Sequence, residues 1–317
     1  MEAGDNLASS SGAHPADSSR TIEKSEAAST VCRNKSCSSR FLECIGAHEI
    51  FSSELWRASL TELVATAALM FTLTTSIISC LESGETNPKL LVPMAVFINA
   101  FLFLLVTVPL TGGHMNPIFS FIALLKGVIT LSRASAYILA QCIGSVIGFL
   151  AIKSVMSHEA AQKFSLGGCA LNGLGPGTAL ILEFICTFLV LFIGVTVAFD
   201  ERRSKELGLV VVCTVVAAAM AVAVFVSVTV TGNAQYGGVG LNPARCLGAA
   251  LAEGRGLWDG HWVFWIGPLL GCVVYSAISS NMPKEGSVPV DEEHSILKLG
   301  QDSCFGSPAN VRTLVSV

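Results

Sequence analysis

The feature that most constrains this chain is a set of long stretches made almost wholly of apolar residues. A helix needs about 20 such residues to cross the hydrocarbon core of a bilayer. Six stretches are long enough: 60–80, 90–110, 134–152, 178–199, 207–230 and 262–280. Only two charged residues, Glu62 and Glu183, fall inside them. We therefore expect an all-α membrane protein with six transmembrane helices.

Composition argues against other classes of protein. Charged residues make up 13% of the 317 residues, against about 25% in an average soluble domain. The net charge of −4 offers no basic surface for nucleic acid. The eleven cysteines are odd in number and scattered, so we interpret them as small apolar side chains and loop thiols, not as a disulfide framework. Among them, Cys32, Cys37 and Cys44 lack the spacing of a zinc site. Neither a metal, a cofactor nor an enzymatic activity is expected.

The distribution of basic residues predicts how the chain is oriented. Six spans place both termini on one side of the membrane, where we count 14 Lys and Arg residues against five on the other. The positive-inside rule therefore places both termini in the cytoplasm. Residues 1–54 and 282–317 lack apolar periodicity, and we expect them to form disordered cytoplasmic tails. Residues 55–281 remain as the membrane domain.

The membrane domain contains an internal repeat, with one copy at about 55–155 and the other at about 175–281. The matching elements are Glu62-x3-Thr66 with Glu183-x3-Thr187, the segments 113–117 and 239–243, and the glycine pairs Gly144/Gly148 and Gly267/Gly271. Each copy has three spans, so the second copy enters the membrane from the opposite face. Inverted repeats of this kind place the solute path between the two halves, near the bilayer midplane.

Each half also carries an Asn-Pro pair followed by a short apolar segment, 118–125 in the first and 244–251 in the second. These segments are too short to span and fit re-entrant half-helices. Asparagine caps free backbone N–H groups, and proline at the first helical position has no N–H to leave unsatisfied. We expect the two N-termini, with the positive ends of their dipoles, to meet within the membrane.

These residues closely resemble the aquaporin or major intrinsic protein superfamily, whose mark is a pair of Asn-Pro-Ala boxes on half-helices. The second box is Asn242-Pro243-Ala244 followed by Arg245, whereas the first is Asn116-Pro117-Ile118, with Ile118 in place of alanine. This departure, together with Cys246 and Leu166-Gly167-Gly168-Cys169, is similar to the plant X intrinsic proteins. The resemblance implies an aquaporin-like fold, a homotetramer with one pore per subunit, and a place in the plasma membrane.

The resemblance and the spacing from the two boxes together assign a selectivity filter. Its members are Val96, Val224, Val239 and Arg245. Arg245 is expected to donate to a solute oxygen and to exclude cations. Asn116 and Asn242 are expected to cap their half-helices through the side-chain oxygen and to offer the amide nitrogen to the lumen.

The two charged residues inside the spans have two interpretations. Glu62 and Glu183 could carry a coupled proton in a transporter, or accept hydrogen bonds from backbone N–H groups of the half-loops. Their symmetric placement, each four residues before a threonine, favours the supporting role. We expect His114 to be a packed, hydrogen-bonded loop residue and not a ligand or a pH sensor.

Three valines and one arginine predict a wide, weakly hydrophilic constriction. The favoured function is a passive channel for small uncharged solutes such as glycerol, urea, boric acid and hydrogen peroxide. Water would pass to a lesser degree, and ions and protons would be excluded. Two alternatives remain: a proton-coupled secondary transporter that uses Glu62 or Glu183, and a non-conducting structural member of the same fold.

Overall fold

The structure is a computed structural model that describes residues 45–85, 87, 90–233, 236–254 and 256–282. Its long helices are α3 (Ser53–Glu82), α4 (Val92–Thr111), α6 (Leu131–Val155), α8 (Pro176–Val190), α10 (Glu201–Val230) and α12 (Val263–Ser280). A π-helical turn, η4 (Leu191–Val195), and α9 (Thr196–Ala198) extend α8. The shorter elements are η1 (Ala47–Phe51), α5 (Pro117–Leu125), α7 (His158–Lys163), η3 (Ser165–Gly167) and α11 (Pro243–Glu253).

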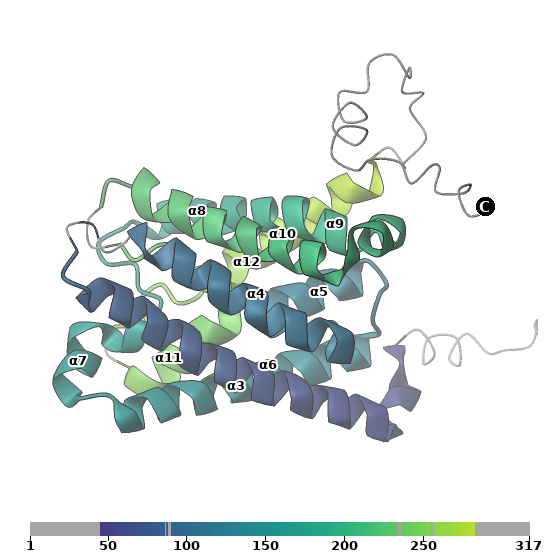
Figure 1. The fold of residues 1–317 in the computed structure, drawn as a ribbon, viewed down its shortest axis with the longest axis horizontal. Helices are drawn as coiled ribbons and strands as arrows, with labels where there is room; N and C mark the ends of the chain where they lie inside the picture. The colour runs from purple at the N-terminus through teal and green to yellow at the C-terminus, as the bar shows by residue number, and fades with distance from the viewer. Residues whose placement is uncertain (1–44, 86, 88–89, 234–235, 255, 283–317) are drawn as a thin grey trace, which may run out of the picture. The chain divides into compact units, whose positions relative to one another are not determined.

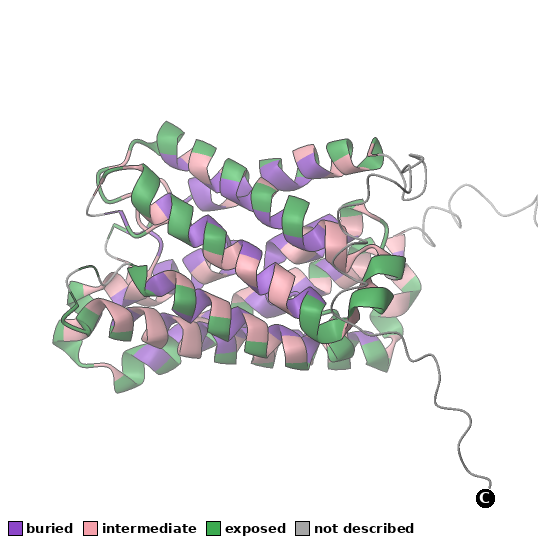
Figure 2. Ribbon diagram, turned by 45° about the horizontal axis from the view of Figure 1, so that its top comes forward, coloured by how far each residue is buried: buried purple, intermediate pink, exposed green. Residues whose placement is uncertain are grey.

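Within the described residues, six helices are long and apolar enough to cross a membrane. They coincide with the six predicted stretches, and the differences are confined to the helix ends. For example, α3 begins at Ser53, earlier than expected, because the side chain of Ser52 accepts a hydrogen bond from the Glu54 backbone N–H at 3.2 Å. Figure 2 shows that the exposed residues line the outer faces of these helices, with the buried ones between them. Many of the exposed residues are large and apolar, as a lipid-facing surface requires.

The internal repeat is visible in how the helices pack. In the first half, a Cβ atom on Gly148 of α6 would lie 2.6 Å from the backbone oxygen of Ala67 in α3. In the second half, a Cβ atom on Gly267 of α12 would lie 2.6 Å from the Cβ atom of Glu183 in α8. The two helix pairs therefore each approach closely at one of the paired glycines, and both contacts leave no room for a larger side chain.

The two predicted half-helices are present as α5 and α11, each beginning at the proline of its Asn-Pro pair. In Figure 1 they lie among the long helices, with α11 toward one end of the bundle and α5 toward the other. Both half-helices pack against α6, which belongs to the first half. This arrangement brings the N-termini of the two half-helices toward one another.

The end of the predicted N-terminal tail is ordered, which corrects the expectation for residues 45–54. Residues 47–51 form η1, held by an ion pair of 3.0 Å between Glu49 and Arg133 of α6. The indole N–H of Trp56 also donates to the Ile50 backbone oxygen at 2.8 Å. Composition alone missed the ion pair because it joins the tail to a distant helix. Residues 1–44, including the three tail cysteines, lie outside the described residues.

A second unit begins at Ala277, and the structure describes it as far as Met282. It contains the last turn of α12, after which the side-chain amide of Asn281 donates to the Ala277 backbone oxygen at 2.8 Å. The predicted C-terminal tail, from 283 onward, lies outside the described residues.

Candidate functional site

The two Asn-Pro pairs start the half-helices in the same way. The side-chain oxygen of Asn116 accepts a hydrogen bond from the Ile118 backbone N–H at 3.0 Å. That of Asn242 accepts from the Arg245 backbone N–H at 3.2 Å. Both asparagines have extended backbone conformations, and proline follows at the first helical position. Each pair therefore caps its helix through the asparagine oxygen.

The asparagine nitrogens join the two halves to each other. Asn116 Nδ2 donates to the Leu241 backbone oxygen at 2.9 Å, and Asn242 Nδ2 donates to the Met115 backbone oxygen at 3.0 Å. Met115 and Leu241 have φ angles of 47° and 54°, a conformation that is rare for residues with side chains. Such strain persists only where the surroundings hold it in place. Here it turns each carbonyl toward the amide of the opposite half.

The two buried glutamates hold the strained segments in place by accepting hydrogen bonds from their backbone N–H groups. Glu62 accepts hydrogen bonds from the backbone N–H groups of His114 at 3.1 Å and Met115 at 2.6 Å. Glu183 accepts from the backbone N–H groups of Gly240 at 2.5 Å and Leu241 at 3.2 Å. Both carboxylates are fully buried. Their oxygens are therefore committed to the backbone that leads into each half-helix.

Side chains around the first half-helix form a polar network. His114 is buried, and its Nδ1 lies 3.0 Å from the Ser120 hydroxyl. Gln141 of α6 donates both to that hydroxyl at 3.0 Å and to Glu62 at 2.9 Å. The ring of Tyr137 meets the edge of the imidazole, with 5.4 Å between the centroids. His114 is thus packed and hydrogen-bonded.

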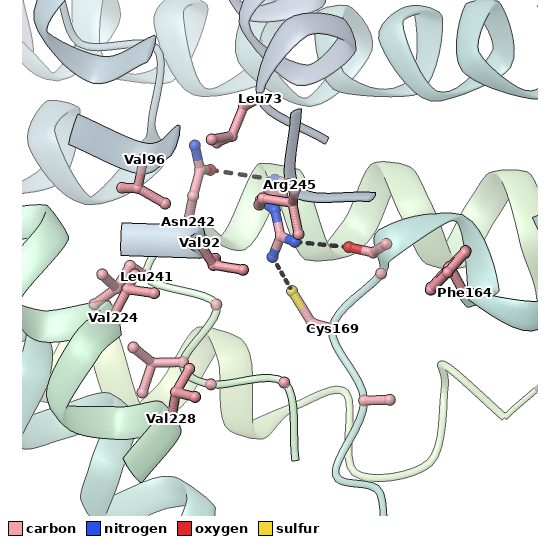
Figure 3. A pocket seen from close by; sticks show the side chains of 18 of the residues that line it. Leu73, Val92, Val96, Phe164, Cys169, Val224, Val228, Leu241, Asn242 and Arg245 are labelled. Carbon is pink, nitrogen blue, oxygen red and sulfur yellow. Dashed lines mark hydrogen bonds between the residues drawn. The ribbon is translucent and has the colours of Figure 1, made fainter. Parts of the chain in front are cut away.

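A cavity of about 350 Å³ opens beside the second half-helix. Its wall contains all four residues assigned to the filter: Val96 of α4, Val224 of α10, Val239 and Arg245. The three valines also share one buried apolar cluster. Asn242 lines the same cavity, and Figure 3 shows Val96, Val224 and Arg245 around the open space. The structure therefore brings together residues that are up to 149 positions apart in the sequence.

A disulfide links this site to the loop after η3. Cys246, in the first turn of α11, is bonded to Cys169, which corrects the interpretation of the cysteines as unpaired. The spacing of 77 residues carries no signal of its own, because the two meet only when the loop folds back over α11. The only signal in the sequence was that both cysteines belong to the motifs of the resemblance, Cys246 directly after Arg245 and Cys169 at the end of Leu166-Gly167-Gly168-Cys169.

The same loop supplies the partners of the Arg245 guanidinium group. One nitrogen donates to the Gly167 backbone oxygen at 2.6 Å, and another lies 3.1 Å from the Cys169 sulfur (Figure 3). From the sequence, Gly167 and Cys169 were known only as part of the motif that resembles the X intrinsic proteins. Their position against Arg245 makes them part of the cavity wall.

The family follows from comparison with known proteins. Residues 49–278 match the family described as Major intrinsic protein. This match covers most of the chain, which therefore belongs to that family. The protein is accordingly an integral membrane channel of the aquaporin type and not an enzyme.

Two plant relatives and one solved structure illustrate the likeness. Aquaporin PIP2-7 of Musa acuminata is 33% identical over 70% of this chain and 79% of its own length. Probable aquaporin PIP2-5 of Arabidopsis thaliana is 30% identical over 76% of this chain and 86% of its own. The X-ray structure of the aquaglyceroporin from Plasmodium falciparum has a TM-score of 0.61 at 20% identity, covering 72% of this chain and 96% of that one. This last likeness concerns the fold.

Proposed function

We propose that the protein is a passive channel for small uncharged solutes, among them glycerol, urea, boric acid and hydrogen peroxide. Water would pass to a lesser degree. The observation that carries this proposal is the makeup of the constriction, where Val96, Val224 and Val239 share one cavity with Arg245. The aliphatic wall suits the carbon backbone of a polyol, and the guanidinium group suits its hydroxyl oxygens.

Exclusion of ions would rest on two features. Arg245 places a fixed positive charge in the cavity wall, which opposes cations. Further in, the positive ends of the α5 and α11 dipoles face the point where Asn116 and Asn242 meet. Each asparagine amide carries two hydrogens, and the cross-bond uses one of them. The second would orient a passing oxygen and interrupt a chain of hydrogen-bonded water.

The contacts of the glutamates favour a channel over a coupled transporter. A coupling carboxylate must exchange its proton with the solute path. Glu62 and Glu183 are instead buried and accept backbone N–H groups. We therefore propose that they support the half-helices. The non-conducting alternative has no specific observation in its favour, because the filter residues line an open cavity.

The same proposal includes the orientation of the channel in the membrane, its subfamily, its cellular membrane and its oligomeric state. Disulfides persist outside the cytosol, so the Cys169–Cys246 bond supports an outward-facing loop and, with the distribution of basic residues, cytoplasmic termini. Membership of the X intrinsic proteins is part of the proposal, because Ile118, Cys246 and Cys169 carry the resemblance to that subfamily. Residence in the plasma membrane and a homotetramer complete the proposal, on the basis of resemblance.

Stopped-flow light scattering of proteoliposomes tests the function. Vesicles with purified protein should take up glycerol and urea several-fold faster than empty vesicles, with a smaller gain for water. A pH gradient should neither accelerate uptake nor drive accumulation. Uptake no faster than that of empty vesicles would support the non-conducting alternative, whereas uphill accumulation driven by the gradient would support the transporter.

A further inference from the structure

We propose that the Cys169–Cys246 disulfide is a specificity-determining element of the channel, which holds one wall of the constriction in place and whose reduction widens the size range of permeant solutes. The inference rests on the proposed function, because it assigns a role at the same constriction. It concerns a covalent bond and a loop that the filter assignment did not include.

The disulfide lies next to Arg245, both in the sequence and in space. Cys246 follows Arg245 in α11, and Cys169 lies two residues after Gly167, whose backbone oxygen accepts the arginine's hydrogen bond. Arg245 thus donates to the Gly167 backbone oxygen at 2.6 Å and lies 3.1 Å from the Cys169 sulfur. The disulfide therefore fixes both acceptors at a set distance from the half-helix that carries the guanidinium group.

The packing around the bond is tight on both sides. A Cβ atom on Gly240 would lie 2.5 Å from the Cys246 sulfur and 3.0 Å from the Cys169 sulfur. A Cβ atom on Gly168 would lie 2.6 Å from a methyl carbon of Leu257. The loop is thus packed against α11 and the segment after it, and the disulfide is packed against Gly240 in the segment before it.

The opposite wall of the constriction is held independently of the bond. The Val239 backbone N–H donates to the Ser227 hydroxyl of α10 at 3.0 Å, and that hydroxyl lies 2.9 Å from the Val224 backbone oxygen. Gly240 is bonded to Glu183 at 2.5 Å. Loss of the disulfide therefore leaves the valine wall in place and releases the loop wall.

The start of the loop has its own anchor, so release would be local. Leu166 is fully buried in the main apolar cluster, whereas Cys169 reaches the cavity beyond it. With the bond broken, the stretch after Leu166 has no covalent link to α11. It keeps the apolar packing of Ala170 and Leu171 and the hydrogen bond from Arg245, so it can shift away from the valines without unfolding. We therefore expect a wider opening in a folded protein.

A small reductant can reach the bond because Cys169 lines the open cavity. With dithiothreitol, the bond between the two sulfurs breaks and each sulfur takes a proton to become a thiol. The two thiols of the reductant supply the electrons and protons and close into a cyclic disulfide. An oxidant that accepts two electrons, such as hydrogen peroxide, would restore the protein bond and be reduced to two molecules of water.

The test compares two polyols that differ by one carbon unit, glycerol and erythritol, in proteoliposomes. Reduction of the wild-type protein by dithiothreitol should raise the ratio of erythritol to glycerol permeability at least twofold, and reoxidation should reverse the change. A Cys169→Ser/Cys246→Ser variant should have the raised ratio permanently and should not respond to the reductant. Cys80→Ser and Cys142→Ser, which change cysteines that are free in the structure, should respond as the wild type does.

The outcomes separate this inference from the proposed function. If oxidised wild-type protein passes no glycerol, the proposed function fails. If glycerol passes but the permeability ratio stays constant or falls after complete reduction, verified by mass spectrometry of alkylated cysteines, the inference is contradicted. Reduction of the folded wild type decides the matter even where the double variant does not fold.

Discussion

The two half-helices share one geometry but are held by different chemistry. Each has an asparagine cap, a strained residue before it and a buried glutamate behind it. Around α5, His114 and Ser120 add a non-covalent polar contact. The residues 126 positions later are Gly240 and Cys246, and there a disulfide and a glycine occupy the corresponding space.

The difference shows which parts of the repeat set the geometry and which set selectivity. The caps and cross-bonds are alike in both halves because both helix starts have the same free backbone groups to satisfy. At the position of Arg245, the first half has Phe119, so the fixed charge belongs to one half only. We infer that selectivity resides where the halves diverge.

The largest expected effect comes from the glutamates and would be unequal. Glu62→Gln should cost about 3 kcal/mol of stability, because the new amide N–H groups face donors that the carboxylate accepted. Glu183→Gln should cost about 2 kcal/mol, because fewer donors face it. Thermal unfolding in detergent measures both, and equal losses would contradict the view that the first half depends more on its polar network.

The next largest effect is expected from Gly240, the glycine that packs against the disulfide in the second half. Gly240→Ala should cost about 2 kcal/mol through overpacking, since the added Cβ atom meets both sulfurs of the disulfide. Gly177→Ala is the matched control, because nothing lies within 4 Å of its added Cβ atom. Thermal unfolding compares the two variants. If Gly240→Ala unfolded at the same temperature as Gly177→Ala, the close packing on the disulfide would be refuted.

A third experiment measures how the positive charge of Arg245, which only the second half carries at this position, affects ionic conductance. Arg245→Ala should raise ionic conductance several-fold in voltage-clamped cells with matched surface expression, while the half-helix dipoles still oppose much of the current. Arg245→Lys keeps the charge and should conduct ions as little as wild type. No increase for Arg245→Ala would place the ion barrier elsewhere, at the meeting point of the half-helices.

The smallest expected effect is on the pH dependence of stability, through His261, which follows the second half-helix in the chain. Burial lowers the pKa of His261 below its ordinary value of 6.5. The unfolded chain therefore takes up this proton first, and stability falls as the pH drops from about 6.5 toward the folded-state pKa. His261→Asn should remove about 1–2 °C of this acid-dependent loss in unfolding temperature. An identical pH profile for both proteins would show that His261 contributes nothing to it.

Much of the fold could be predicted because its signals are local. Span length follows from apolar composition, and the start of each half-helix follows from its own Asn-Pro pair. The repeat added the relation between the halves. The assigned filter valines also lie in one cavity, because their spacing from the boxes fixes which helical face they occupy.

The remaining features depend on contacts between distant segments. The Cys169–Cys246 bond joins the loop between the two halves to a helix of the second half, and neither cysteine has a spacing that indicates its partner. The order in residues 45–54 arises in the same way, from an ion pair between Glu49 and Arg133. Composition describes the segment but not the surface on which it packs.

We propose that solutes pass through the constriction formed by three valines and one arginine. Val96→Trp adds bulk to that wall, and Val106→Trp is the control on the same helix, where the side chain is 63% exposed. We predict that Val96→Trp lowers glycerol permeability at least fivefold and water permeability less, while Val106→Trp leaves both unchanged. If Val96→Trp passed glycerol as fast as wild type at equal protein content, the conducting path would lie elsewhere in the protein.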